Sequence, residues 1–190
     1  DAINIYYETN SQEDPTSNFQ WEFVLVDDDQ TKNAWCMPGG KIAFYSGILP
    51  ILKNQDGIAS VMGHEIAHAV ARHSAERAST AMVTDLGIMA LERLVLGQRL
   101  PQAAGYVRQF GLDLPFNRRQ ESEADYLGLI FSSLAGYDIN ESYKVWERMK
   151  EDMGGSGPSE FFSTHPSPDN RIKNLKEWIP IVSKQYPAIG

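Results

Sequence analysis

The chain has 190 residues, 42% of them hydrophobic, which is enough for one globular domain (residues 1–190) with a core of its own. Its formal net charge of −8 argues against nucleic acid or an anionic membrane surface as a partner, because no dense basic patch is present. The single cysteine, Cys36, excludes an internal disulfide.

No segment has the length and apolar character of a transmembrane span. The most apolar run, residues 81–96, is interrupted by Asp85, Glu92 and Arg93. The chain begins at Asp1 without a charged and apolar leader, so we expect any signal peptide, lipid anchor or other membrane tether to lie upstream of these residues.

The N-terminal part of the chain is predicted to contain mainly strands. Residues 3–7 predict a strand, and the polar residues 9–18 predict a loop that completes an N-terminal segment, residues 1–20. Three elements then follow: a strand at 21–26 with Trp21, Phe23 and Leu25 on one face, a hairpin of 33–37 and 41–45 around Pro38-Gly39-Gly40, and a short helix at 46–52.

The strongest signal for chemistry is the H-E-x-x-H spacing of His64, Glu65 and His68 on an apolar helix whose N-terminal cap is predicted at Asp56-Gly57. His64 and His68 are one helical turn apart, so both imidazoles face the same side and can bind one metal ion. Glu65 is turned away from that face, beside the open coordination position. A carboxylate there can take a proton from water.

These three side chains also have a simpler interpretation. His64 and His68 would be hydrogen-bonded histidines of the core, and Glu65 would pair with Arg72 or Lys53. The metal interpretation is favoured because the complete pattern lies on an apolar helix, where three polar residues need a reason.

A catalytic zinc site needs a third protein ligand, because such sites hold three ligands and a water. His73 is turned off the ligand face and is expected to face solvent. Glu121 is the better candidate, since it shares a helix face with Asp125 one turn later. Glu121 would bind the metal, and Asp125 would accept a hydrogen bond from the second ring nitrogen of His64. The alternative is a charged helix face held by ion pairs.

Helices dominate the rest of the chain. Asn117 and Gln120 predict the capped start of a helix at 118–135, which Gly136 ends. The other predicted elements are a helix at 78–96 with Met82 and Leu86 in the core, an irregular segment at 97–116 that is either a mobile cover or a fixed loop, an amphipathic helix at 137–153, a flexible joint at 154–158, and a final helix opened by Pro168.

His64-Glu65-Ile66-Ala67-His68, followed by Glu121-Ser122-Glu123-Ala124-Asp125, resembles the M48 family of zinc endopeptidases, within it the soluble bacterial members and the Oma1-like peptidase domains. Three further stretches carry the resemblance: residues 33–42, 114–119 and 163–171. It implies an α+β fold, a mainly helical, gluzincin-like zincin domain with a small antiparallel sheet beside the active-site helix.

The resemblance also implies roles for particular residues. Glu121 rather than Glu123 would be the third ligand, and His165 would lie near the site, where it reaches the metal or the substrate oxyanion. An edge strand at about residues 33–38 would hold a polypeptide substrate in extended form. Arg171 is expected to anchor its segment by an ion pair.

The function expected on these grounds is hydrolysis of unfolded or misfolded proteins, with one Zn²⁺ per chain and Glu65 and His165 as catalytic residues. No Walker-type phosphate loop is present, so the activity would be independent of ATP. The expected location is the periplasm or cell envelope, with a lipoprotein as one full-length form. The alternative is a non-catalytic or latent zinc-containing chaperone or assembly factor, latent if His165 closes the site as a fourth ligand.

Overall fold

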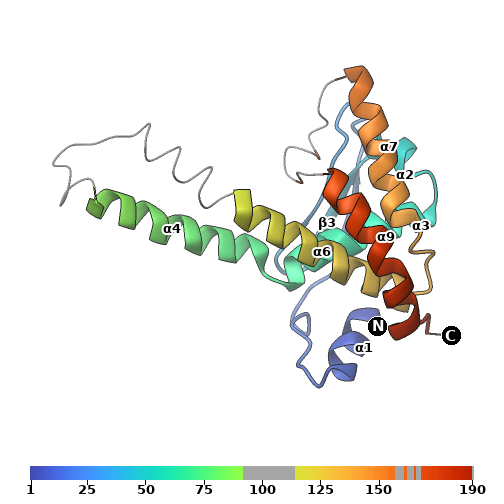
Figure 1. The fold of residues 1–190 in the computed structure, drawn as a ribbon, viewed down its shortest axis with the longest axis horizontal. Helices are drawn as coiled ribbons and strands as arrows, with labels where there is room; N and C mark the ends of the chain where they lie inside the picture. Colours follow the sequence, from blue (N-terminus) through green and yellow to red (C-terminus); the bar gives the residue numbers. More distant parts are fainter. Residues whose placement is uncertain (92–113, 157–160, 162–164, 166–167, 190) are drawn as a thin grey trace.

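A computed structural model describes residues 1–91, 114–156, 161, 165 and 168–189. Most of these residues are helical, and a small sheet accompanies the helices, so the predicted α+β class is confirmed (Figure 1). The elements are α1 (Ala2–Thr9), β1 (Glu22–Val26), β2 (Ala34–Met37), β3 (Lys41–Tyr45), η1 (Ser46–Ile48), α2 (Leu49–Leu52), α3 (Gln55–Val70), α4 (His73–Leu91), α6 (Leu114–Leu134), α7 (Glu141–Ser156) and α9 (Pro168–Gln185).

The sheet has the strand order β1-β3-β2. β2 and β3 form the predicted antiparallel hairpin, and Gly39 and Gly40 make its turn with positive φ angles of 92° and 94°. β1 pairs with β3 in parallel, so the sheet is mixed rather than antiparallel throughout. The order leaves β2 at an edge of the sheet, on the side that packs against α3.

The strand predicted at residues 3–7 is wrong, because these residues belong to the helix α1. Tyr6 explains the difference, since the centre of its ring lies 5.8 Å from the ring centre of Phe131 and 5.7 Å from that of Tyr186. Helical spacing brings Ala2, Ile3 and Tyr6 to one side, where they pack against the core. Packing with distant helices, invisible in the local pattern, decides the conformation of this segment.

α3 begins one turn earlier than its apolar pattern. Its N-cap is Asn54, whose side chain accepts a hydrogen bond of 2.9 Å from the backbone N–H of Gly57, so the predicted cap at Asp56-Gly57 is wrong. α3 packs most extensively on α6. The two helices are close together at Gly63 and Gly128, where a Cβ atom on Gly128 would lie 2.8 Å from the backbone nitrogen of His64.

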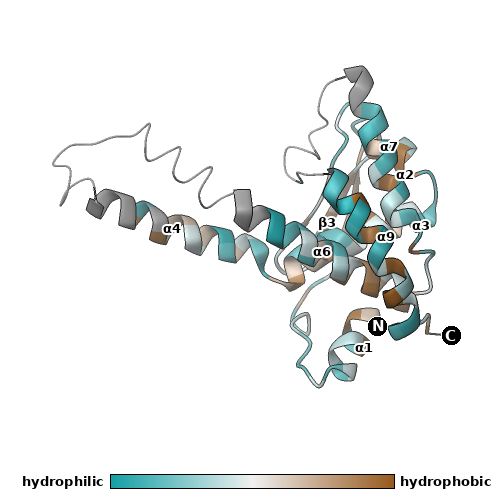
Figure 2. Cartoon of the chain, viewed as in Figure 1, coloured by the Kyte–Doolittle hydropathy of each residue, from teal (hydrophilic) through white to brown (hydrophobic). Residues whose placement is uncertain are grey.

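α4 projects from the body of the molecule as a long arm (Figure 1). Met82 and Leu86 were expected in the core, but they are 67% and 61% exposed, and hydrophobic segments are visible along the arm in Figure 2. The prediction is wrong because helical spacing of apolar residues does not show whether another element covers them. No helix in the described part of the chain is long and apolar enough to cross a membrane.

Several helix ends differ from the predictions, and α4 begins at His73 rather than at residue 78. α6 begins at Leu114, so Asn117 lies inside the helix and does not cap it. α7 begins at Glu141 and continues through the first part of the predicted joint to Ser156. Gly136 ends α6 with a φ of 83°, and Pro168 opens α9, both as predicted. The irregular segment predicted at 97–116 lies almost wholly outside the described residues.

Replacement of Gly128 by Ala is expected to destabilise the protein by about 1–3 kcal/mol, because the new methyl group would force α3 and α6 apart. Denaturant unfolding of both proteins measures the difference. In an ordinary helix interior the same substitution stabilises by roughly 0.5–1 kcal/mol. A gain of that size here would contradict the close helix contact.

Candidate metal centre

The inner face of α3 presents His64 and His68 to the interior, where both side chains are buried. Their Nε2 atoms are 3.1 Å apart. The distance follows from the one-turn spacing, which stacks the two residues on one side of the helix. Both nitrogens therefore point at a common position.

Glu121 reaches the same position from α6. Its Oε2 lies 3.4 Å from His64 Nε2, and its Oε1 lies 3.3 Å from His68 Nε2. The crossing of α3 and α6 at Gly63 and Gly128 brings this carboxylate over the two histidines.

These distances fit a metal ion. Ligand atoms about 2.0–2.1 Å from a tetrahedral ion are about 3.3–3.4 Å from one another, close to the separations of the His64, His68 and Glu121 donors. His165 joins them: the four residues each offer a donor atom within 4.8 Å of the others, and all four are buried.

Asp125 lies beside His64, on the side of the ring away from the donors. Its Oδ1 is 3.0 Å from His64 Nδ1, and Arg171 holds the carboxylate with bonds of 2.7 Å from Nε and 2.5 Å from Nη2. The Arg171 guanidinium stacks 3.6 Å from the ring centre of Trp146 and approaches Glu121 Oε2 to 2.8 Å. Arg171 thus ties α9 to α6 by ion pairs, as expected for an anchor.

The pKa shifts of these buried groups favour the binding of a cation. Burial alone raises the pKa of Glu121, but hydrogen bonds with His165, His64 and His68 lower it far below its usual range. Burial lowers the pKa of His68 to about 3, which leaves a neutral imidazole. Burial and Arg171 lower the pKa of His64, yet Asp125 and Glu121 outweigh them and raise it to about 9. A bound cation would displace that proton.

Glu65 and His165 face each other at the edge of the donor cluster. His165 Nδ1 lies 2.9 Å from Glu121 Oε2 and 3.2 Å from His64 Nε2, and its Nε2 lies 3.2 Å from Glu65 Oε1. Glu65 Oε1 is buried without a hydrogen-bond partner among the described residues. The imidazole of His165 therefore lies between the donor cluster and Glu65.

A hollow of about 440 Å³ opens onto these groups. Its lining comes from β2 and the residue before it, Asn33 to Cys36, from Glu65 and His68 of α3, from α4, and from His165. β2 is an edge strand, and an edge strand has backbone groups that can pair with an added chain.

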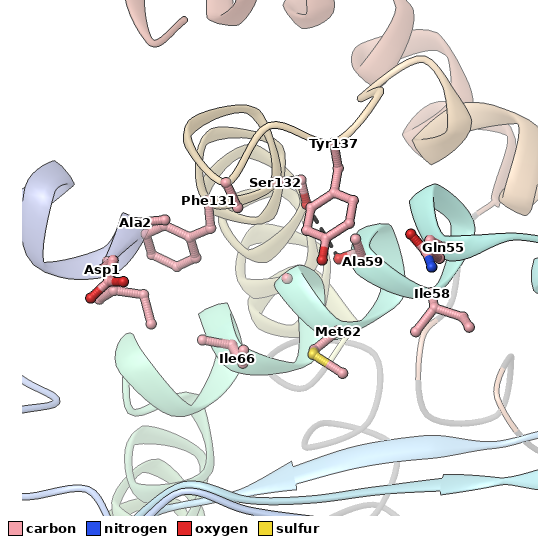
Figure 3. A pocket seen from close by; sticks show the side chains of 13 residues that line it. Asp1, Ala2, Gln55, Ile58, Ala59, Met62, Ile66, Phe131, Ser132 and Tyr137 are labelled. Atoms are coloured by element: carbon pink, nitrogen blue, oxygen red, sulfur yellow. Dashed lines mark hydrogen bonds between the residues drawn. The ribbon is translucent and has the colours of Figure 1, made fainter. Parts of the chain in front are cut away.

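A second hollow, of about 490 Å³, lies elsewhere (Figure 3). Its lining is mainly apolar and comes from α1, α3, α6 and Tyr137; α3 contributes Ile58, Met62 and Ile66. These positions point roughly half a turn away from His64 and His68. It contains none of the donor residues and has no part in the metal centre.

The prediction for His73 is wrong. This residue was expected to face solvent, yet it is 1% exposed and its ring contacts that of His68. The prediction assumed one continuous helix, whereas α3 ends at Val70 and Arg72 takes a positive φ of 56°. The break turns His73 inward, and nothing in the histidine spacing signals it.

Comparison with known proteins adds a family match. The family model of Peptidase family M48 matches residues 8–179. The mitochondrial metalloendopeptidase OMA1 of Schizosaccharomyces pombe is 44% identical over 166 residues, 86% of this chain and 48% of that protein. The protein of the same name from Saccharomyces cerevisiae is 39% identical over 182 residues, 88% of this chain and 49% of that protein.

A bacterial relative is more distant. The beta-barrel assembly-enhancing protease of Yersinia pestis is 30% identical over 168 residues, 82% of this chain and 34% of that protein. The chain spans about half of the length of the two yeast relatives.

These relatives correct the predicted location. The periplasm or cell envelope was expected, with a lipoprotein as one form. That prediction is wrong, because the yeast relatives, at 44% and 39% identity, are named as mitochondrial enzymes, whereas the bacterial protease is 30% identical.

Substitution of Glu121 by Gln is expected to weaken metal binding by more than the roughly 10–100-fold typical of losing an outer hydrogen-bond partner. The reason is that the substitution removes an anionic donor from the buried cluster. Competition with a chromogenic chelator, with zinc as the probe, measures the affinity. Glu123→Gln is the matched control, since Glu123 is half exposed and lies outside the cluster. Equal losses for both variants would contradict the assignment.

Proposed function

The chain belongs to peptidase family M48, and on that premise we propose that it is a zinc endopeptidase that cleaves unfolded or misfolded polypeptides. The observation that carries the proposal is the buried cluster of His64, His68 and Glu121, with Glu65 at its edge and a hollow along β2 leading to it. Residues 1–190 would act as one peptidase domain.

Zinc is the ion that best suits the donors. Two imidazoles and one carboxylate form the ligand set of many hydrolytic zinc sites, whereas calcium and magnesium prefer sites made of oxygen atoms. His64, His68 and Glu121 would hold the ion, and Asp125 would fix the ring of His64 through Nδ1. Zinc bound there supplies a Lewis acid that polarises the scissile carbonyl and lowers the pKa of water.

Glu65 is the proposed general base. Its Oε1 is buried, forms no hydrogen bond among the described residues and lies 3.2 Å from His165 Nε2, so this oxygen faces the site. It would take a proton from the attacking water and deliver it to the amine of the leaving peptide. The carboxylate is on the same helix as both histidine ligands, which keeps its distance from them constant.

The substrate would bind as an added strand along β2. Asn33, Ala34, Trp35 and Cys36 line the hollow that holds Glu65 and His68. Main-chain hydrogen bonds to an edge strand select an extended backbone rather than a particular sequence. Such a site accepts unfolded chains, and the sequence has no Walker-type loop with which ATP could drive unfolding.

The names of the yeast relatives favour a mitochondrial location for the whole protein. We therefore propose a role in the turnover of unfolded proteins in that organelle.

Digestion of casein, an unfolded protein, tests the function. The zinc-loaded chain is expected to cleave it, and Glu65→Gln is expected to lower the rate by about 10²–10⁴-fold, the usual contribution of a general base. Zinc content is measured on both proteins, because the variant should keep the metal while losing turnover. Equal cleavage by both would remove Glu65 from the mechanism.

His165 supports a second candidate, a closed and latent form of the same enzyme. Its Nδ1 is within 2.9–3.2 Å of donor atoms of Glu121 and His64, where a fourth ligand would lie. The ring also separates these donors from Glu65, in the space that an attacking water needs. In this form the protein would hold zinc and bind polypeptides without cleaving them, as a chaperone does.

Replacement of His165 by Phe distinguishes the two roles of this histidine. If the closed form dominates, the variant should cleave casein faster than the wild type while its zinc content stays the same. If His165 instead stabilises the oxyanion, turnover should fall by about 10²–10³-fold. An unchanged rate would exclude both roles.

A further inference from the structure

The ring of His73 lies directly against that of His68 at the start of α4. The Nδ1 atoms of the two rings are 2.8 Å apart, and the ring centres are 4.9 Å apart at an angle of 73°. Both side chains are buried, so water does not compete for this contact. A separation of 2.8 Å between two ring nitrogens requires one to donate a hydrogen bond to the other.

The direction of this bond follows from the metal centre. Nε2 of His68 faces the donor atoms of His64 and Glu121, so it must carry the lone pair when a metal is bound. The proton of His68 is then on Nδ1, which donates to Nδ1 of His73. The proton of His73 must be on its Nε2, which is buried without a hydrogen-bond partner among the described residues and lies 3.5 Å from the carboxylate of Glu123.

The backbone around His73 is held in place by α6. Gln120 Nε2 donates a bond of 3.3 Å to the carbonyl oxygen of His73, and also one of 2.8 Å to Glu76. Arg77 donates to Oε1 of the same Gln120 side chain at 3.0 Å. Because Gln120 precedes Glu121, the carboxylate donor and the support of His73 are neighbours on one helix.

The two histidine donors of α3 have different partners. His64 faces the carboxylate of Asp125, which Arg171 holds. No carboxylate is seen against Nδ1 of His68 in the described part of the structure; that place is taken by His73. His73 does not belong to the donor cluster itself, so it is not a further metal ligand.

We propose that His73 is a positioning residue: its Nδ1 accepts the Nδ1–H of His68 and so fixes the tautomer and the ring orientation with which His68 binds the metal. The inference rests on the proposed metal-binding function of the site. Partners of this kind hold a ligand in its binding geometry, and their loss typically costs 10–100-fold in metal affinity. A neutral imidazole does this without adding another negative charge to the buried cluster.

The test compares His73→Phe with His73→Asn. Phe keeps a ring but has no acceptor, so it leaves the buried N–H of His68 unpaired. We expect its zinc affinity, measured by chelator competition, to fall about 10–100-fold. Asn offers an amide oxygen at nearly the position of Nδ1, so its affinity should stay within about threefold of the wild type. The visible spectrum of the cobalt-loaded His73→Phe variant should differ from that of the wild type, and the spectrum of His73→Asn should match the wild type.

A separate control variant shows whether a loss of stability alone lowers zinc affinity. Val182→Ala creates a cavity in α9, and it should lower the melting temperature without changing zinc affinity, because Val182 is a buried residue of the apolar core outside the donor cluster. The role of His73 would be overturned if His73→Phe and His73→Asn lost zinc affinity equally, or if His73→Phe lost none. If the wild type itself bound no zinc, the proposed function would fail instead.

Discussion

The close contact between α3 and α6 is the constraint on which the site depends. At Gly63 and Gly128 the absence of a Cβ atom on either helix lets the two backbones nearly touch. Glu121 then lies above the histidines of α3 at distances that suit a metal ion. A larger residue at the crossing would separate carboxylate and imidazoles, even if every side chain of the site were kept.

Charge balance is the second constraint, because buried ionic groups are costly unless they are paired. The carboxylates of Glu121 and Asp125 share one guanidinium, that of Arg171, so the cluster keeps an excess of negative charge. A divalent cation would offset that excess. Without it, the raised pKa of His64 allows an imidazolium to take its place. The same carboxylates therefore suit both a loaded and an empty site.

Local periodicity was enough to predict the central part of this structure. A helix alone places His64 and His68, one turn apart, on the same face. A second helix does the same for Glu121 and Asp125. That Glu121 rather than Glu123 joins the two histidines was supplied by the family resemblance. The errors arise where tertiary contacts decide: Tyr6 makes residues 3–7 helical by packing on distant rings.

The ring of His165 lies between the proposed metal ligands and Glu65, the proposed base. One nitrogen approaches the donors of Glu121 and His64, and the other approaches Glu65. Movement of that ring out of the cluster would free the fourth coordination position and uncover Glu65 in one step. Because the hollow beside β2 is also lined by His165, a polypeptide bound there would contact the same ring. Substrate binding and opening of the site would then be coupled, since each competes with the closed position of this imidazole.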